Sequence, residues 1–376
     1  MTAAIEELKS SSKKPLSVVF DVIAVEQGIP LSTGTTSQSF EIEYSLYGDT
    51  ELPVIVIIGG ITASREVLAL SKLSQEKLDE SKTMLRKQVS SNDQSISSGW
   101  WSELVGRNKA IDTKEYCVLS FNYISRINVV TPTNQRISHT LTPTDQASVL
   151  HLLLDSLQIQ KPITIIGSSY GGMVGLSFAE QFTKRIKQLT CISASDRSTH
   201  TARAIRSIQK DIFELAASPK QKYQALALAR KLSILFYRTD DIFDAQFIDP
   251  IVQSPLGQVI DFEKTIYSYL NHQGQKFANN TTIKNYAALL DSIDSHSVNA
   301  HKIKCSCSFL AVPNDRLVSY ESMRKLAHKV SGKSKFYRLE SIYGHDAFLK
   351  EFKQLTELLK KILGESDEPS TNYASC

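Results

Sequence analysis

Two kinds of hydrophobic pattern alternate along the chain. Stretches rich in apolar residues, as expected of strands in a parallel sheet, occur at residues 52–60, 116–124, 163–168, 186–195 and 304–315, and the first of them is a continuous apolar run that ends in two glycines. Between them, residues 142–159 and 170–182 place apolar side chains at every third or fourth position, as an amphipathic helix does. We expect Thr144 and Asp145 to cap the first of these helices. The alternation predicts an α/β fold, with a mostly parallel sheet flanked by helices.

The strand pattern stops between residues 196 and 302, where helical spacing dominates. Strand-like stretches return afterwards, at 304–315 and 335–346. An α/β pattern with such an interruption predicts a sheet domain that carries an inserted helical lid. The predicted organisation is a core of residues 15–195 and 303–363 and a lid of residues 196–302.

Polar stretches mark the remaining segments. Residues 1–14 and 364–376 have the composition of disordered chain ends. Residues 70–98 are rich in charge and serine with only a thin apolar stripe, which predicts a surface insertion. Trp100 and Trp101 follow it, and we expect them to be partly buried where the insertion rejoins the core rather than to form a binding patch.

The overall composition restricts the class of protein. Of the 376 residues 41% are hydrophobic and 22% are charged, as in ordinary globular proteins. The net charge of +4 is small and no cluster of Lys and Arg alternates with aromatic residues, so nucleic acid is not an expected partner. No stretch suits a membrane span, and the first twenty residues lack the apolar segment of a secretory signal. Five scattered cysteines, an odd number, suit a reducing compartment, and we expect a cytoplasmic protein.

The stretch ITIIGSSYGGMVGLSFAEQF places a serine where a predicted strand stops and a predicted helix begins. Gly167, Ser169 and Gly171 fit the pattern G-x-S-x-G. In this context the pattern forms the nucleophile elbow of α/β-hydrolases, a strained turn that lifts the serine hydroxyl above the sheet. The sequence thus predicts an α/β-hydrolase fold with an inserted helical lid. The alternative is a plain packing turn, in which the glycines only relieve crowding.

A serine nucleophile needs a base, and the base needs a third group that orients it. In this fold the partners follow in the chain order Ser, Asp or Glu, His, each on a loop after a late strand. Asp315 ends the stretch SFLAVPND, and His345 follows the next predicted strand. We therefore predict a triad of Ser169, Asp315 and His345, against the alternative of a helix-capping aspartate and an ordinary loop histidine.

The negative charge that develops on oxygen during acyl transfer requires preorganised N–H donors. One is expected to be the backbone N–H of Tyr170, the residue after the nucleophile, and the other comes from the loop after an early strand. That loop reads IIGGITAS, and we assign the second donor to Ile61.

A zinc site is a competing interpretation of four residues near the end of the predicted lid. They are His296, His301, Cys305 and Cys307. The two cysteines fall within the apolar stretch that delivers Asp315, where buried structural cysteines are common. We therefore expect no metal.

Six stretches together carry a family resemblance that runs from about residue 40 to residue 355. They are GGITASREV, GWWSELVG, AIDTKEYCVLSF, TPTDQASVL, GSSYGGMVGLSFA and YGHDAFLKE. They resemble the homoserine O-acyltransferases, members of the α/β-hydrolase superfamily. The resemblance implies acyl transfer from a CoA thioester to the hydroxyl of L-homoserine, a step of methionine biosynthesis. It also implies acyl-CoA as co-substrate with no further cofactor, and a homodimer formed through the lid helices.

The resemblance also assigns roles to residues. Ser169 is the nucleophile, His345 the general base and Asp315 its orienting partner, while Asp346 receives the ammonium group of the substrate. In the family, an arginine of a Gln-Arg pair on the first lid helix holds the substrate carboxylate. The matching residue here is Lys210, which keeps the charge but loses the bidentate fork of arginine.

Arg206, one helical turn before Lys210, can reach the same region. A solvated helix face is the alternative for both cations. A succinyl donor needs a cation near its free carboxylate, whereas an acetyl donor needs only a small apolar pocket. After Asp315 in the sequence, Arg316 offers such a charge and Leu317 does not. The stretches GGITAS, GWW and SSYGGM look more similar to the succinyl-using branch of the family, so we slightly favour succinyl as the acyl group.

Three other functions share these features. A serine esterase or thioesterase has the same triad with water as the final acceptor. An acyltransferase for another hydroxy amino acid, such as serine, is a second alternative. The third is a non-catalytic member of the fold that serves as a binding or scaffold protein, against which the intact triad argues.

Overall fold

The computed structural model describes residues 18–68, 99–130, 135–247 and 265–365. The predictions for residues 1–14 and 70–98 lie outside these ranges. The predicted disordered end at 364–376 also lies outside them, except for its first two residues, which complete the last helix.

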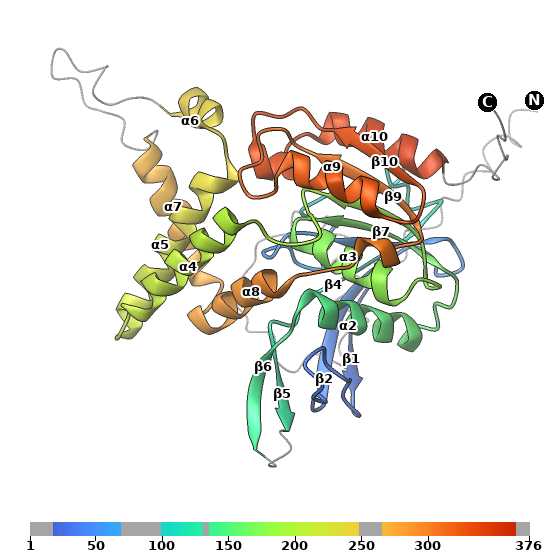
Figure 1. Cartoon of the computed structure of the whole chain (residues 1–376), viewed down its shortest axis with the longest axis horizontal. Helices are drawn as coiled ribbons and strands as arrows, with labels where there is room; N and C mark the ends of the chain where they lie inside the picture. The colour runs from blue at the N-terminus through green and yellow to red at the C-terminus, as the bar shows by residue number, and fades with distance from the viewer. Residues whose placement is uncertain (1–17, 69–98, 131–134, 248–264, 366–376) are drawn as a thin grey trace, which may run out of the picture.

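An eight-stranded sheet forms the centre of the molecule, with helices on both faces (Figure 1). Its strands are β1 (Val18–Val25), β2 (Phe40–Tyr47), β3 (Val54–Ile58), β4 (Cys117–Phe121), β7 (Ile163–Ser168), β8 (Ile186–Ile192), β9 (Ser306–Ala311) and β10 (Ser334–Arg338). Their spatial order is β1-β2-β4-β3-β7-β8-β9-β10. Strand β2 pairs antiparallel with β1 and β4, and the remaining pairs are parallel. The predicted α/β fold with a mostly parallel sheet is confirmed.

In the described ranges, four helices and two short 3-10 turns belong to this domain. They are α2 (Pro143–Ser156), α3 (Tyr170–Gln181), α9 (Tyr320–Lys329), α10 (Phe352–Glu365), η2 (Ala300–Lys302) and η3 (Gly344–Leu349). The predicted cap of α2 was wrong by two residues: Thr142 is the N-cap and forms a capping box with Asp145. Pro143 explains the shift, because a proline lacks the N–H that the first helical position leaves unused.

Side chains of β3 point alternately into two cores, as the period of a strand requires. Val54, Val56 and Ile58 join the cluster that includes buried residues of α2, α3 and α9. Ile55 and Ile57 join the cluster on the other face, which includes buried residues of α10. All five residues are buried, which explains why this strand reads as an uninterrupted apolar stretch.

Between β8 and β9 the described chain is helical, with no strand. The helices are α4 (His200–Glu214), α5 (Pro219–Tyr237), α6 (Asp240–Gln246), α7 (Ile266–Asn279) and α8 (Ile283–Ser295). We call these the lid helices; they lie beside the sheet domain in Figure 1. Phe213, Leu226, Tyr286 and Leu290 belong to a small apolar core of their own. In the described parts of the chain, no helix has the length and hydrophobicity that a membrane span requires.

A two-stranded hairpin projects below the sheet domain in Figure 1 and was not predicted. Its strands are β5 (Arg126–Val130) and β6 (Arg136–Thr140). Each has only five residues and mixes apolar with charged or polar residues, so that no long apolar run marks either strand in the sequence. The first strand, β1, was also missed, although its sequence VVFDVIAV is largely apolar. It lies at the edge of the sheet, and most of its residues are half-exposed or exposed.

Gly171 gives a test of the packing between α3 and β3. A Cβ at this position would lie 2.1 Å from the Ile58 carbonyl oxygen, so Gly171→Ala forces the helix away from the strand. We expect the free energy of unfolding to fall by roughly 3 kcal/mol, at the upper end of the cost of overpacking. Denaturant titration measures this change.

The matched control is Gly364→Ala, because an added Cβ at Gly364 meets no atom within 4 Å. This variant should stay within about 1 kcal/mol of the parent, in the stabilising direction that the helix propensity of alanine predicts. Equal unfolding midpoints for the two variants would contradict the close packing of Gly171.

Candidate active site

Ser169 is the single residue between β7 and α3, and its backbone angles are φ 53° and ψ −120°. A non-glycine residue with positive φ is strained, and the surroundings must hold it there. The Ser169 N–H donates to the Ile192 carbonyl and the Gly171 N–H to the Gly59 carbonyl, both at 2.9 Å. An added Cβ at Gly167 would lie 2.4 Å from the Gly171 carbonyl oxygen, so this position excludes a side chain. The turn has the construction of a nucleophile elbow.

The structure brings the three predicted triad residues together. His345 Nε2 lies 2.8 Å from Ser169 Oγ, and His345 Nδ1 lies 2.7 Å from Asp315 Oδ2. The other carboxylate oxygen of Asp315 accepts the N–H groups of Leu317 and Val318, both at 2.9 Å. With the carboxylate fixed in this way, His345 donates from Nδ1 and presents Nε2 as the acceptor for the serine proton.

The environment of His345 changes its pKa. Burial of the ring lowers the pKa, but the charge and hydrogen bond of Asp315, together with the charge of Asp346, outweigh burial, and the net pKa is raised above 6.5. A stronger base accepts the serine proton more readily, provided that the imidazole is neutral at the working pH.

The two residues predicted to supply the oxyanion donors, Ile61 and Tyr170, line the same cavity as Ser169. Tyr170 is the first residue of α3, where a backbone N–H has no acceptor within the helix. Gly60 to Ala63 form a turn closed by a 2.9 Å hydrogen bond from the Ala63 N–H to the Gly60 carbonyl, which leaves the Ile61 N–H outside the turn's own bond. A Cβ built on Gly60 would lie only 3.9 Å from Ser169 Oγ, so this loop adjoins the nucleophile.

Ser169 and His345 open into a cavity of about 350 Å³ between the sheet domain and the lid helices. The core contributes Trp100, Tyr170 and Leu317 to the lining, among others, and the lid contributes Ile205 and Leu290. A cavity of this size with mostly apolar walls and a few polar groups has the usual form of a small-molecule site.

Asp346 lines this cavity, directly after His345 in the chain. Its Oδ2 lies 3.3 Å from Nε of Arg238, whose guanidinium in turn lies over the ring of Tyr269, 5.1 Å from its centroid. The predicted ammonium ligand therefore has a cationic partner within the protein.

Arg206 also lines the cavity and is 8% exposed. Its Nε donates to Asp294 Oδ1 at 2.8 Å, and Nη2 lies 2.7 Å from the same oxygen, although its N–H groups are not aligned for a hydrogen bond. Among the described residues Nη1 has no acceptor. Lys210 is not part of the described lining: its Nζ lies 2.9 Å from Asp291 Oδ1 and 3.7 Å from Asp294 Oδ2.

Sequence reasoning missed the lining residues of α5, among them Arg230, Ser233 and Tyr237, and the next residue, Arg238. The Arg230 guanidinium lies 5.3 Å from the ring centroid of Tyr237, whose ring lies 5.9 Å from that of His345. The first three recur at intervals of three and four positions, which places them on one face of the helix. That spacing of polar and aromatic residues could have identified this face of α5 as part of the site.

The residues of the competing zinc interpretation are not gathered around one point. His296 Nε2 lies 3.0 Å from the Ser195 carbonyl oxygen, and the sulfur atoms of Cys305 and Cys307 are 3.9 Å apart. Throughout the described ranges, no three His, Cys, Asp or Glu side chains are arranged to hold a metal ion. Trp101 is buried and Trp100 is half-buried, as predicted.

Comparison with known proteins places the chain among its relatives. Residues 107–352 match the family model described as alpha/beta hydrolase fold. The homoserine O-succinyltransferase of Xanthomonas campestris pv. campestris is 28% identical over 333 residues, which cover 88% of this chain and 81% of that protein. A homoserine O-acetyltransferase of Thermus thermophilus is 30% identical over 290 residues, which cover 70% of this chain and 72% of that protein.

A solved structure is similar over nearly the whole chain. The crystal structure of homoserine O-acetyltransferase from Staphylococcus aureus has a TM-score of 0.72 at 19% identity, over 96% of this chain and 98% of that one. Fold, matched family model and relatives agree with the motif resemblance. The chain belongs to the homoserine O-acyltransferases, a family of the α/β-hydrolase superfamily.

The hydrogen-bonded arrangement predicts that Ser169 reacts with a fluorophosphonate probe. Ser169→Ala should abolish labelling and His345→Ala should slow it at least about a hundredfold, because the serine loses its base. Intact-mass spectrometry measures the extent of labelling. The neighbouring Ser168→Ala is the matched control, since the Ser168 hydroxyl is buried and has no hydrogen-bond partner among the residues that the structure describes. If Ser168→Ala also lost labelling, the assignment of the nucleophile would be wrong.

The raised pKa of His345 predicts the pH dependence of that labelling. Only the neutral imidazole accepts the serine proton, so the rate should rise with pH through a midpoint above 6.5. Asp346→Asn removes one of the charges that raise the pKa and should move the midpoint to lower pH. Glu357→Gln, an exposed carboxylate of α10, is the control that should not move it. A parent midpoint at or below 6.5 would contradict this account.

Proposed function

We propose that this protein transfers an acyl group from acyl-CoA to the hydroxyl of L-homoserine through an acyl-enzyme on Ser169. The observation that carries the proposal is the hydrogen-bonded series from Asp315 through His345 to Ser169, at the base of a cavity that the lid helices complete. The family to which the chain belongs supports homoserine as the acceptor. In this role the enzyme serves methionine biosynthesis and needs no cofactor beyond its acyl-CoA co-substrate.

The reaction has two half-reactions with one proton path. Ser169 Oγ attacks the thioester carbonyl while His345 Nε2 takes the hydroxyl proton, and the same proton then leaves with the CoA thiol. Homoserine next enters, His345 takes the proton from its hydroxyl, and the alkoxide attacks the acyl-serine ester. Collapse of this second intermediate releases O-acylhomoserine and returns the proton to Ser169.

Both tetrahedral intermediates carry negative charge on the former carbonyl oxygen. The N–H groups of Ile61 and Tyr170 are positioned beside Ser169 to receive it. Removal of one such donor typically costs about 10²–10³ in rate, so this pair supplies a large share of the catalysis. Asp315 keeps the imidazolium oriented between the two proton transfers and stabilises its charge.

The acceptor requires groups for its ammonium and its carboxylate. Asp346 is the proposed ligand of the ammonium group, with Arg238 holding the carboxylate in place. Arg206 is the proposed ligand of a substrate carboxylate, because its Nη1 has no acceptor in the described part of the chain and the side chain lines the cavity. A serine acceptor would be one methylene shorter, and it remains the alternative within this reaction class.

The charges around the cavity favour succinyl over acetyl as the acyl group. Arg206, Arg230 and Arg238 line it from the lid, whereas Asp346 is the one carboxylate among the described lining residues. A succinyl chain brings a second carboxylate besides that of homoserine. Arg316 is not the cation for it, because its Nη2 pairs with Asp240 Oδ2 at 2.6 Å outside the cavity lining.

Association through the lid helices is a further part of the proposal. Large apolar side chains of the lid helices are exposed to solvent. Among them are five with exposed fractions from 41% to 82%, namely Ile208, Leu215, Leu228, Leu235 and Tyr267. A second copy of this chain would cover them, and sedimentation equilibrium would test the resulting homodimer. The cytoplasmic location stays a prediction from the cysteine content.

Release of free thiol from acetyl-CoA and succinyl-CoA, each with and without L-homoserine, tests the proposed reaction. We expect thiol release to depend on homoserine and to be at least about tenfold faster with succinyl-CoA than with acetyl-CoA. A charge-assisted hydrogen bond to the free carboxylate of the succinyl group accounts for a difference of this size. Mass spectrometry of the product identifies the ester.

Other outcomes separate the alternatives. Equal release with and without an acceptor would identify an esterase or thioesterase. Release that requires L-serine instead would change the acceptor, and no release from any thioester by a protein whose Ser169 does not label would favour a non-catalytic scaffold.

A further inference from the structure

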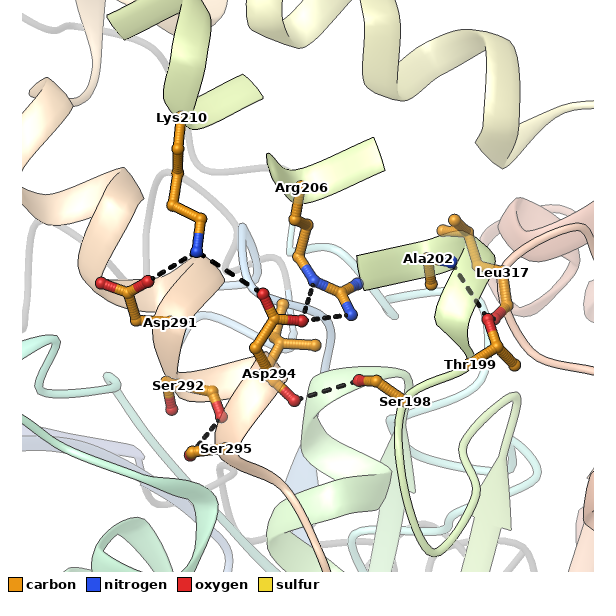
Figure 2. A network of polar contacts seen from close by, with 11 residues as sticks. Ser198, Thr199, Ala202, Arg206, Lys210, Asp291, Ser292, Asp294, Ser295 and Leu317 are labelled. Carbon is orange, nitrogen blue, oxygen red and sulfur yellow. Dashed lines mark hydrogen bonds and ion pairs between the residues drawn. The ribbon is translucent and has the colours of Figure 1, made fainter. Parts of the chain in front are cut away.

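Two cations of α4 face two carboxylates of α8 beside the cavity (Figure 2). Arg206 and Lys210 are one turn apart on α4, and Asp291 and Asp294 are three residues apart on α8. Asp294 is shared: its Oδ1 holds Arg206 Nε at 2.8 Å, while its Oδ2 lies 3.7 Å from Lys210 Nζ. Lys210 donates to Asp291 as well, at 2.9 Å.

The two cations differ in where they lie. The side chain of Arg206 is 10% exposed and lines the cavity, whereas the side chain of Lys210 is 34% exposed and is not among the described lining residues. We propose that Lys210 and Asp294 form a positioning pair that holds the Arg206 guanidinium with Nη1 free for a substrate carboxylate. This inference rests on the proposed function and gives Lys210 a positioning role in place of the direct contact that the sequence predicted.

The charge balance explains why the lysine is needed. Without Lys210, Arg206 would face Asp291 and Asp294 alone, and one guanidinium beside two carboxylates carries a net charge of −1. Such a group repels a substrate carboxylate. With Lys210 bound to Asp291 and near Asp294, the four residues are neutral together, and the free edge of Arg206 stays attractive to an anion.

The helix that carries Asp294 is itself anchored to the nucleophile elbow. In the turn before Asp294, the Ser292 hydroxyl lies 2.7 Å from the hydroxyl of Tyr170, the residue after Ser169. The Ser198 hydroxyl donates to the Ile293 carbonyl at 3.0 Å (Figure 2). Asp294 thus stands at a fixed position relative to Ser169, which allows it to place Arg206 accurately.

The carboxylate that binds Arg206 can belong to either of two compounds. It is the terminal carboxylate of a dicarboxylic acyl group or the carboxylate of the amino acid acceptor. Two assays separate them, and neither needs CoA or turnover of homoserine. The first compares acylation of Ser169 by mono-p-nitrophenyl succinate with acylation by p-nitrophenyl acetate. The second measures how L-homoserine and 3-amino-1-propanol, which lacks the carboxylate, protect Ser169 from the fluorophosphonate.

We expect Lys210→Met to weaken recognition of the carboxylate in one of these assays by roughly five- to tenfold, as coupling within one ion-pair network does. The effect should appear as a loss of preference for the carboxylate-bearing compound over its neutral counterpart. Lys210→Arg should restore the preference, and Arg206→Met should remove it completely. Lys284→Met is the matched control, because Lys284 is an exposed cation of α8 outside this network.

Each result has one meaning. A response in the first assay identifies the acyl carboxylate, and a response in the second identifies the acceptor carboxylate. The positioning role is overturned if Arg206→Met abolishes the preference while Lys210→Met does not, or if Lys210→Met weakens charged and neutral compounds equally. The carboxylate site itself is overturned if Arg206→Met changes neither assay. If homoserine then fails as an acceptor for any acyl-CoA while the assays still respond, the proposed function fails and the positioning pair stands.

Discussion

The close approach of the nucleophile elbow to strand β3 is the contact on which the site depends. Gly171 lies so near the Ile58 carbonyl that no side chain fits between them, and its N–H donates to the Gly59 carbonyl. This contact holds Ser169 in its strained conformation and at the same time fixes the loop that contains Gly60 and Ile61. The nucleophile and both expected oxyanion donors are therefore positioned by one short stretch of backbone packing, which explains why both sides of the contact are glycine-rich.

The sequence reveals this part of the site because it depends on backbone geometry. A glycine that a close contact requires stays visible at a fixed distance from the serine, and a buried parallel strand stays visible as an apolar stretch. Asp315 and His345 were predictable for the same reason, since each follows a strand at the edge where the site lies. The hairpin β5–β6 was not predicted, because its short strands mix apolar and polar residues. The edge strand β1 was not predicted either, although its sequence is largely apolar.

The lid contacts were harder to predict because helix faces decide them. Lys210 and Arg206 differ by one turn of α4, yet one pairs with carboxylates outside the cavity and the other lines it. Helical spacing places both on the same side of α4 but does not say which partner each side chain finds on α8. Alignment with a family motif cannot decide it either, because a lysine in place of an arginine changes the reach and the number of donors of the side chain.

The difference between a transferase and a hydrolase lies in how the acceptor is held rather than in the triad. In the proposed reaction the acyl-serine meets either water or the homoserine hydroxyl, and the same His345 activates both. A bound acceptor gains the advantage when it is held in an attacking geometry, which is worth up to about 10⁵–10⁸ M in effective concentration. As the proposed ligand of the ammonium group, Asp346 would contribute to this advantage directly, because it is adjacent to His345 in the chain. An ammonium group on Asp346 and a hydroxyl at His345 Nε2 are then fixed by two consecutive residues of η3. One local arrangement of η3 would therefore place the general base and orient the acceptor at the same time.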